Sequence, residues 1–315
     1  MKENPILTRE RIFSKRETLI KRQNIINAIR AMFISDNYLE IETPIRIESP
    51  APEANIDTIQ SEGRFLIASP ELQMKRVVGA GYDKIFQITK CFRKDETGRT
   101  HLTEFTMLEW YKKDGTVETL INDCKEIIKA AAIAVNQYPV ISGTENRKPI
   151  FLNKEWPVYD INDTYEKVAG WRPGPNPDED RFDFDMVDKI EPWLPLDRPA
   201  FLTKYPAKMA SLARLDKNNP AVAMRTELYA GGLELANGFE ELTDPKIQEE
   251  RFIAEEKLRR EKGKPPYPID ELFINDLKLG IPNCAGMAMG LDRLIMLLTG
   301  KEEINEVVAL SPDEI

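Results

Sequence analysis

The sequence contains one histidine, His101, and three widely separated cysteines, Cys91, Cys124 and Cys284, with no CxxC motif. So few imidazole and thiolate ligands argue against a structural zinc site, and the cysteine pattern favours a reducing compartment. No apolar run approaches the roughly 20 residues that a transmembrane helix needs. The N-terminal segment also lacks the apolar core of a signal peptide. The sequence therefore predicts a cytoplasmic protein that does not enter a membrane.

Positive charge is scarce as well, since 44 Lys and Arg residues face 53 Asp and Glu residues, giving a net charge of −9. Binding along a nucleic-acid backbone normally requires a basic face. The acidity counts mildly against such a function, because an acidic chain can still carry a local basic patch. Apolar residues are abundant at 42% of 315 residues, enough for the core of one large α+β domain or two smaller ones.

Residue patterns predict a series of helices and strands without a regular βαβ repeat. The predicted helices are 14–37, 116–136, 244–262 and 291–299, and the predicted strands are 85–95, 102–111, 200–205, 223–241 and 286–290. The segment at about 140–198 is rich in Pro, Asp and Asn and is expected to be an irregular insertion with short helices. Together these elements predict a single α+β domain spanning residues 1–315, with an antiparallel sheet flanked by helices.

Two predicted strands place charged and aromatic residues on a shared face. Alternation along the first strand places on one face Gln87, Thr89, Cys91, Arg93 and Asp95. Alternation along the second strand likewise places on one face Phe105, Met107, Glu109 and Tyr111. An arginine beside an aromatic ring suits a nucleotide, because the guanidinium binds phosphate oxygens and the ring stacks on the base. An ordinary ion pair between Arg93 and Glu109 explains the same spacing equally well.

Two glutamates flank a predicted hairpin turn at residues 231–232. A two-residue Gly-Gly turn pairs residue 230 with 233, 229 with 234, and 227 with 236. Glu227 and Glu234 then lie diagonally on one face, which is unfavourable unless a cation such as Mg²⁺ lies between them. Two solvated glutamates are the alternative. Simple alternation also puts Asn237 on the opposite face from Glu234, which leaves either a bulge at Gly238 or a different register.

Arg293 lies in the first turn of the predicted 291–299 helix. The helix dipole disfavours a cation there by about 0.3–1 kcal/mol. A bound anion such as a triphosphate offsets this cost, and pairing with Asp292 or a nearby glutamate is the alternative. His101 falls in the loop between the two strands that carry Arg93 and Phe105.

Three segments of the chain resemble the motifs of class II aminoacyl-tRNA synthetases in their lysyl form. Residues 92–95 (FRKD) and 101–109 (HLTEFTMLE) look like motif 2, residues 38–44 look like motif 1, and residues 286–294 (GMAMGLDRL) look like motif 3. Motif 1 lies at the dimer interface in that family, so the resemblance implies a homodimer through Pro44. Three motifs in the correct order are far more specific than a single pattern.

The resemblance implies a role for each residue of an ATP site. Arg93 is expected on the α-phosphate and the substrate carboxylate, and Arg293 on the outer phosphates, so these two are the predicted catalytic residues. His101 is a further expected phosphate contact. Phe105 is expected to stack on adenine, and Asp95, where the family usually has Glu, to accept from the adenine amino group. By the same resemblance, Glu227 and Glu234 hold Mg²⁺.

The resemblance also implies a pocket for a cationic amino acid. Glu71 and Glu109 match residues that bind the amino group of lysine, and Asn237 and Glu241 match residues that bind its side chain. Tyr111 belongs to the same pocket. Acidic residues suit an ammonium substrate, whereas a pocket for aspartate would need an Arg or a Lys.

Only 37 residues precede motif 1 in this chain, whereas lysyl-tRNA synthetases carry an anticodon-reading domain there. In this respect the sequence resembles the elongation factor P–(R)-β-lysine ligase family. Ala288 and Ser211 agree, because the synthetases have Gly and Pro at the matching positions, and Ala288 is expected to reshape the pocket. The resemblance implies lysine or (R)-β-lysine as substrate and a lysine of elongation factor P as acceptor, with tRNA not expected.

Three other functions remain open at this point. One is a truncated lysyl-tRNA synthetase-like enzyme that charges tRNA or releases lysyl-adenylate. Another is an asparagine synthetase, which Glu109, Tyr111 and Glu241 argue against. The third is a non-catalytic paralogue that binds an amino acid or regulates a partner, although the presence of both arginines and both glutamates weighs against such decay.

Overall fold

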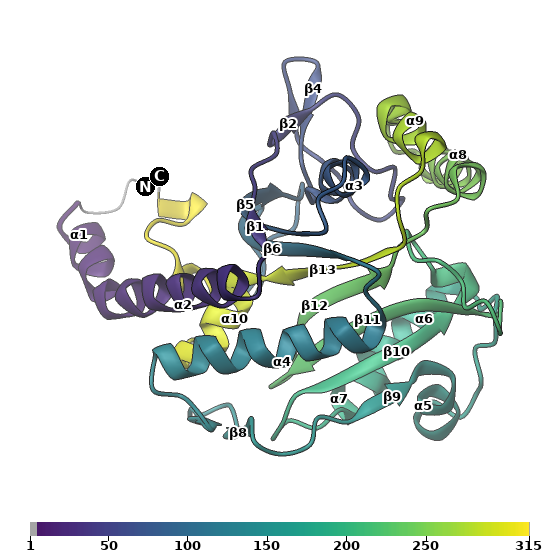
Figure 1. The fold of residues 1–315 in the computed structure, drawn as a ribbon. Helices are drawn as coiled ribbons and strands as arrows, with labels where there is room; N and C mark the ends of the chain where they lie inside the picture. The colour runs from purple at the N-terminus through teal and green to yellow at the C-terminus, as the bar shows by residue number, and fades with distance from the viewer. Residues whose placement is uncertain (1–4, 315) are drawn as a thin grey trace.

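A mixed eight-stranded sheet runs through the computed structural model, which describes residues 5–314 (Figure 1). The six inner strands are antiparallel, and the two edge strands are parallel to their neighbours. In sheet order the strands are β1 Leu39–Glu40, β5 Lys84–Phe92, β6 Glu104–Lys113, β13 Cys284–Gly290, β12 Leu233–Glu240, β11 Val222–Ala230, β10 Ala200–Pro206 and β9 Val158–Asp160. The α+β class is confirmed, and the sheet is mixed rather than wholly antiparallel.

Helices cover both faces of this sheet. The residues of α2, α4 and α10 pack in one apolar cluster on one face, and those of α3 and α9 pack in a second cluster. The helices are α1 Pro5–Ser14, α2 Arg16–Ser35, α3 Glu71–Gly79, α4 Val117–Ala134, α5 Ile161–Val168, α6 Glu179–Asp185, α7 Glu191–Trp193, α8 Pro245–Glu261, α9 Glu271–Leu279 and α10 Leu291–Thr299. Among the described residues, no helix is both long and apolar enough to span a membrane.

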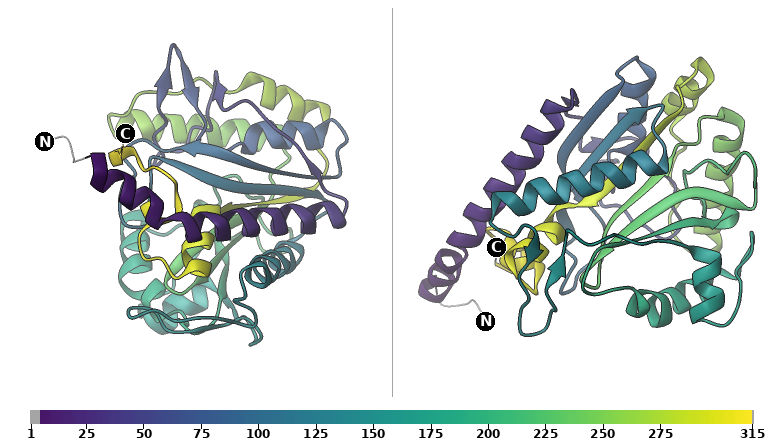
Figure 2. Two further views of the ribbon diagram at one scale, coloured as in Figure 1. Left: turned by 90° about the vertical axis from the view of Figure 1, so that its left-hand side faces the viewer. Right: turned by 60° about the horizontal axis from the view of Figure 1, so that its bottom comes forward.

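The predicted 14–37 helix corresponds to α2, whereas α1 and α9 were not predicted. The chain turns between α1 and α2 at Lys15, a residue that is only 8% exposed. Its Nζ lies 2.9 Å from an Oε atom of Glu314. Figure 2 shows the N-terminal helices running beside the C-terminal segment. This ion pair between the two ends of the chain depends on tertiary structure, so helical periodicity alone could not reveal the turn between α1 and α2.

The segment 140–198, expected to be irregular, contains several ordered elements. A short hairpin is formed by β7 Val140–Ile141 and β8 Ile150–Phe151. Strand β9 then joins the main sheet beside β10. Helices α5 and α6 follow, with a π-helical turn at Met186–Ile190 leading into α7.

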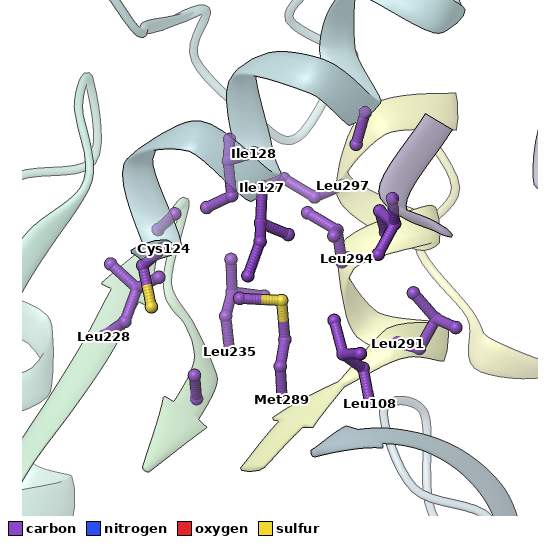
Figure 3. Packing of buried hydrophobic residues seen from close by; sticks show 14 of the residues in the cluster. Leu108, Cys124, Ile127, Ile128, Leu228, Leu235, Met289, Leu291, Leu294 and Leu297 are labelled. Carbon is purple, nitrogen blue, oxygen red and sulfur yellow. The ribbon is translucent and has the colours of Figure 1, made fainter. Parts of the chain in front are cut away.

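Alternation along the central strands separates the core from a polar face (Figure 3). Leu108, Leu228 and Met289 lie in the apolar cluster with residues of α4 and α10. Successive strand residues point to opposite sides of a sheet. Their sequence neighbours Glu109 and Glu227 therefore point to the other face, away from this core.

The β11–β12 hairpin has the predicted turn but not the predicted register. Residues 230 and 229 pair with 233 and 234 as expected, whereas Glu227 pairs with Asn237 instead of residue 236. A bulge leaves Leu235 without a residue directly opposite, so of the two alternatives the different register is confirmed and the bulge at Gly238 is not. Leu235 and Ala236 are both buried in the apolar cluster. Burial of two consecutive apolar residues shifts the alternation and turns Asn237 to the same face as Glu227.

A second, small sheet lies at the edge of the polar face. It contains β2 Arg46–Ile47, β4 Arg64–Leu66 and β3 Gln60–Ser61. The hairpin of β3 and β4 turns at residues 62–63. The loop before it is tied to α8, because Arg259 donates to the carbonyl oxygens of Glu53 and Ile56.

Candidate active site

A row of side chains crosses the polar face of the sheet from β5 to β11. Direct pairing places Gln87 opposite Glu109, Glu109 opposite Ala288, Ala288 opposite Asn237, and Asn237 opposite Glu227. Directly paired residues point to the same face and lie about 4.5–5.5 Å apart. Three of the predicted substrate residues and one predicted metal ligand are therefore neighbours, with the methyl group of Ala288 between Glu109 and Asn237.

The next row along the strands carries the aromatic part of the same face. Tyr111 pairs with Gly286, Gly286 with Phe239, and Phe239 with Arg225. A Cβ on Gly286 would overlap ring carbons of Tyr111. The glycine is thus required by the close approach of the ring, and the Tyr111 hydroxyl is free to donate to Oε1 of Glu109 at 2.7 Å.

Helix α3 packs against β6 and completes a largely buried acidic cluster, the candidate substrate pocket. Its Glu71 and Lys75 are four residues apart, and Lys75 Nζ lies 2.6 Å from Oε1 of Glu71. The same ammonium contacts Oε2 of Glu241, which directly follows β12. Lys75, Glu109 and Glu241 are each at most 2% exposed. The structure therefore brings Glu71, Glu109 and Glu241 together, and it adds a buried lysine that the sequence patterns did not single out.

Several acceptor atoms of this pocket have no hydrogen-bond donor. They are Oε2 of Glu109, Oδ1 of Asn237 and Oε1 of Glu241, all buried. Burial, followed by the nearby charge of Glu71, raises the pKa of Glu109 well above its usual value. Buried acceptors without donors are unfavourable. A ligand with N–H donors would relieve this cost.

Arg93 follows β5 at the next part of the site. Its guanidinium carbon lies 5.3 Å from the ring centroid of Phe105, and its Nη1 lies 3.7 Å from Oε2 of Glu96. The Nε–H of Arg93 is buried without an acceptor. A guanidinium beside an aromatic ring can bind a phosphate whose attached base lies against the ring.

Asp95 lies apart from the Arg93–Phe105 pair. Its side chain is 85% exposed, and a Lys94 Nζ 3.9 Å away is the ion-pair partner. Asp95 also has a positive φ of 62°. The structure therefore places this predicted adenine contact in the solvent-exposed turn after β5.

Arg293 and His101 meet on the other side of the polar face. The guanidinium contacts Nε2 of the histidine and donates to the carbonyl oxygens of Thr100 at 3.2 Å and Glu234 at 2.9 Å. Burial and then the charge of Arg293 lower the pKa of His101. Asp292 is not the partner of Arg293, because its carboxylate accepts from Arg22 at 2.6 Å. Arg293 is thus held by backbone acceptors and by a long ion pair with Glu234, 3.9 Å away, which is the nearby glutamate that the sequence offered as an alternative partner.

Glu227 and Glu234 are close enough to influence each other. Burial and then the like charge of Glu227 raise the pKa of Glu234 to about 7. Both oxygens of Glu227 are already engaged, Oε1 by Arg225 at 2.6 Å and Oε2 by the hydroxyls of Tyr229 at 2.8 Å and Tyr205. The carboxylate of Glu234 lies 3.9 Å from Arg293. Within residues 5–314, no group of three or more His, Cys, Asp or Glu side chains is arranged to bind a metal.

Three residues of this face were missed by sequence reasoning. Lys75 follows Glu71 by one helical turn, and Arg225 precedes Glu227 by two strand positions, so simple spacing could have pointed to both. Glu53 lies in the loop before β3, where no pattern marks it. Burial and the charge of Glu71 raise the pKa of Glu53 to about 7, while Arg93 opposes them.

Comparison with known proteins gives a consistent assignment. The model of the family "tRNA synthetases class II (D, K and N)" matches residues 3–314. The chain is 36% identical to the elongation factor P–(R)-β-lysine ligase of Histophilus somni strain 2336, over 94% of this chain and 95% of that protein. It is also 36% identical to the ligase of the same name from Haemophilus ducreyi, over 93% of each chain. This chain therefore belongs to the class II tRNA synthetase family and, within it, to the elongation factor P–(R)-β-lysine ligase family.

Proposed function

We propose that this protein uses ATP to activate (R)-β-lysine or lysine as an aminoacyl-adenylate. The activated acyl group is then transferred to a lysine side chain of elongation factor P. One observation carries the choice of substrate: the buried oxygens of Glu109, Asn237 and Glu241 that lack donors lie on one wall of an acidic pocket. A diamino acid supplies ammonium donors for these acceptors. The acceptor protein is proposed from the name that the relatives carry.

Activation begins with the substrate carboxylate beside Arg93. The guanidinium neutralises this carboxylate and the α-phosphate as they approach, and Phe105 provides a surface for adenine. A carboxylate oxygen forms a bond to the α-phosphorus, the bond to the leaving oxygen breaks, and diphosphate departs. Arg293, with the neutral ring of His101 beside it, stabilises the charge that develops on the departing diphosphate. Catalysis here consists of positioning and charge neutralisation.

Transfer follows from the adenylate. The neutral ε-amino group of the acceptor lysine attacks the acyl carbon, an amide bond forms, and AMP leaves with the bonding electron pair. The amine gives up one proton in this step. No side chain is assigned as its base.

The carboxylate pair formed by Glu227 and Glu234 fits a magnesium ion in part. Glu234 and Glu227 would hold the ion, which would neutralise phosphate charge when bound. Burial and the like charge of Glu227 raise the pKa of Glu234, and a cation at this point would offset both effects. We further propose that Asp95 contacts the adenine amino group and that the methyl of Ala288 selects the amino-acid backbone. A homodimer through the segment containing Pro44 and a cytoplasmic location complete the proposal.

The test is amino-acid-dependent exchange of labelled diphosphate into ATP. We expect exchange with (R)-β-lysine or lysine and none with aspartate or asparagine. Labelled product should then appear on elongation factor P and not on tRNA. Exchange that requires aspartate would refute the pocket assignment, labelled tRNA would favour a truncated synthetase, and binding without exchange would favour a non-catalytic paralogue.

A further inference from the structure

Lys75 is a buried cation in the substrate pocket that the proposed reaction does not use. It is 1% exposed, and its Nζ lies 2.6 Å from Glu71 and in contact with Glu241. Helix α3, which carries Lys75, packs against β6, the strand of Glu109 and Tyr111. The ammonium group therefore lies among the carboxylates that are proposed to bind substrate.

Burial of a lysine side chain is unfavourable unless its charge is paired, because the ammonium group loses its hydration. Two carboxylates compensate it here. Even so, the ammonium does not satisfy the whole pocket, since Oε1 of Glu241 and Oε2 of Glu109 still lack donors. Lys75 thus neutralises part of the negative charge of the pocket and leaves two acceptor oxygens without a donor.

The charges of the pocket can be counted. Glu71, Glu109 and Glu241 contribute three negative charges when ionised, and Lys75 contributes one positive charge, so three minus one leaves two. A diamino acid carries two ammonium groups, and its carboxylate is paired with Arg93 in the proposed function. Buried charges are tolerated when they are paired. The count therefore matches a substrate with two ammonium groups.

We propose that Lys75 is a positioning and specificity-determining residue: it holds Glu71 and Glu241 in place and limits the pocket to the two ammonium groups of a diamino acid. This inference rests on the proposed function and names the residue that sets how much positive charge the substrate must carry. A purely structural ion pair would stabilise the fold equally well but would leave the affinity for the amino acid unchanged.

Electrostatics around Glu241 agree with this role. Burial raises the pKa of Glu241, the ammonium of Lys75 is the strongest opposing influence, and Glu71 raises the pKa again. The other titratable groups facing this site are Glu109 and Tyr111 on β6, Cys284 on β13 and, beside Glu71, Glu53 in the loop before β3, whose pKa values are all raised by burial first. Without the lysine, Glu241 would hold a proton to a higher pH. The pocket would then lose the charge that attracts an ammonium group.

The experiment compares Lys75→Gln with wild type by diphosphate exchange across the neutral pH range. Glutamine can still donate hydrogen bonds but carries no charge. We expect the KM for the diamino acid to rise by about thirtyfold or more, as when one member of a buried charge pair is removed. The rise should be steeper at lower pH, with the KM for ATP within about twofold of wild type. Lys75→Arg, which keeps the charge, should recover part of the loss.

Lys15→Gln is the matched control. Lys15 is also a buried lysine, 8% exposed and paired with Glu314 at 2.9 Å, but it lies where α1 meets α2. The Lys15→Gln variant should have a lower midpoint of thermal unfolding but an unchanged KM for the amino acid and for ATP. An unchanged amino-acid KM and pH profile in Lys75→Gln would overturn the Lys75 proposal alone. A wild type that shows no exchange with either amino acid would overturn both this proposal and the proposed function.

If Lys75→Gln does not fold, Lys75→Ala with added propylammonium provides the second test. The alanine variant leaves space for a small ammonium ion beside Glu71 and Glu241. We expect propylammonium to lower the amino-acid KM of the variant, whereas it should compete with the amino acid in wild type. Propanol should have neither effect. Equal effects of propylammonium and propanol on the variant would overturn the assignment of Lys75 as the resident cation.

Discussion

The ring of Tyr111 lies over Gly286 on the neighbouring strand, so closely that a Cβ on residue 286 would overlap the ring carbons. The same tyrosine donates a hydrogen bond to Glu109 at 2.7 Å. A glycine on β13 therefore determines where a carboxylate on β6 is held. This relationship links a backbone requirement to the proposed substrate pocket.

Gly286→Ala should displace Tyr111 and with it the carboxylate of Glu109. We expect a higher KM for the amino acid, a nearly unchanged KM for ATP, and a loss of about 1–3 kcal/mol in the free energy of unfolding from overpacking. Exchange kinetics and chemical denaturation measure these effects. Gly290→Ala on the same strand is the stability control, because its Cβ would lie at an ordinary 3.6 Å from Arg293. Equal destabilisation by both substitutions would contradict this explanation.

Glu241→Gln should abolish the preference for a cationic amino acid. The amide cannot neutralise an ammonium group, so kcat/KM for the diamino acid should fall by about thirtyfold or more. The adjacent Glu240→Gln is the matched control, since Glu240 pairs with Arg214 and accepts from the backbone N–H of Val117 at 3.0 Å. That variant should lose stability and keep its selectivity. Unchanged selectivity in Glu241→Gln would refute the pocket assignment.

Binding of a diamino acid should release protons. Burial raises the pKa of Glu109 well above its ordinary value of 4.5, and an arriving ammonium group lowers it again. Calorimetric titrations in two buffers with different ionisation enthalpies measure the number released. In the ligand-free protein, this group makes folding less favourable as pH rises above 4.5, because the folded carboxyl retains a proton that the unfolded chain has lost. Identical apparent enthalpies in both buffers would show that no proton is released.

Removal of the Arg259 guanidinium should destabilise the protein strongly. Arg259 is fully buried, stacks 3.8 Å from the ring centroid of Tyr267, and lies 2.8 Å from Asp57. We expect Arg259→Met to lower the free energy of unfolding by about 3–5 kcal/mol, because buried acceptors lose their partner. The neighbouring Arg260→Met removes an exposed arginine and should change stability by less than about 0.5 kcal/mol. Urea denaturation of both variants makes the comparison, and similar losses would contradict the role of burial.

Glu234→Gln should weaken the response to magnesium. Loss of a proposed carboxylate ligand should raise the half-saturating magnesium concentration for exchange by about tenfold. The KM for the amino acid should change little, since Glu234 lies toward Arg293 rather than toward Lys75. A magnesium response identical to that of wild type would remove Glu234 from the proposed metal site.

Local sequence patterns identify most of the long elements of this fold. The helices at α4, α8 and α10 and the strands β5, β6, β10, β11 and β13 fall where periodicity and turn residues predict them. These elements have strong alternating or helical apolar patterns, which depend only on neighbours along the chain. The helix 14–37 was also predicted and corresponds to α2, whereas the turn at Lys15 that separates it from α1 and the entry of β9 into the sheet depend on contacts between distant segments.

By itself, the sequence determined the α+β class, the two-residue hairpin turn and the ordered motifs from which the candidate site residues were chosen. The tertiary structure alone decided that Glu227 faces Asn237, because burying Leu235 and Ala236 together shifts the strand alternation by one residue. It alone also placed Lys75 between Glu71 and Glu241. The reason is that strand register and the pairing of buried charges are set by which distant elements pack together, and spacing along the chain carries no record of that packing.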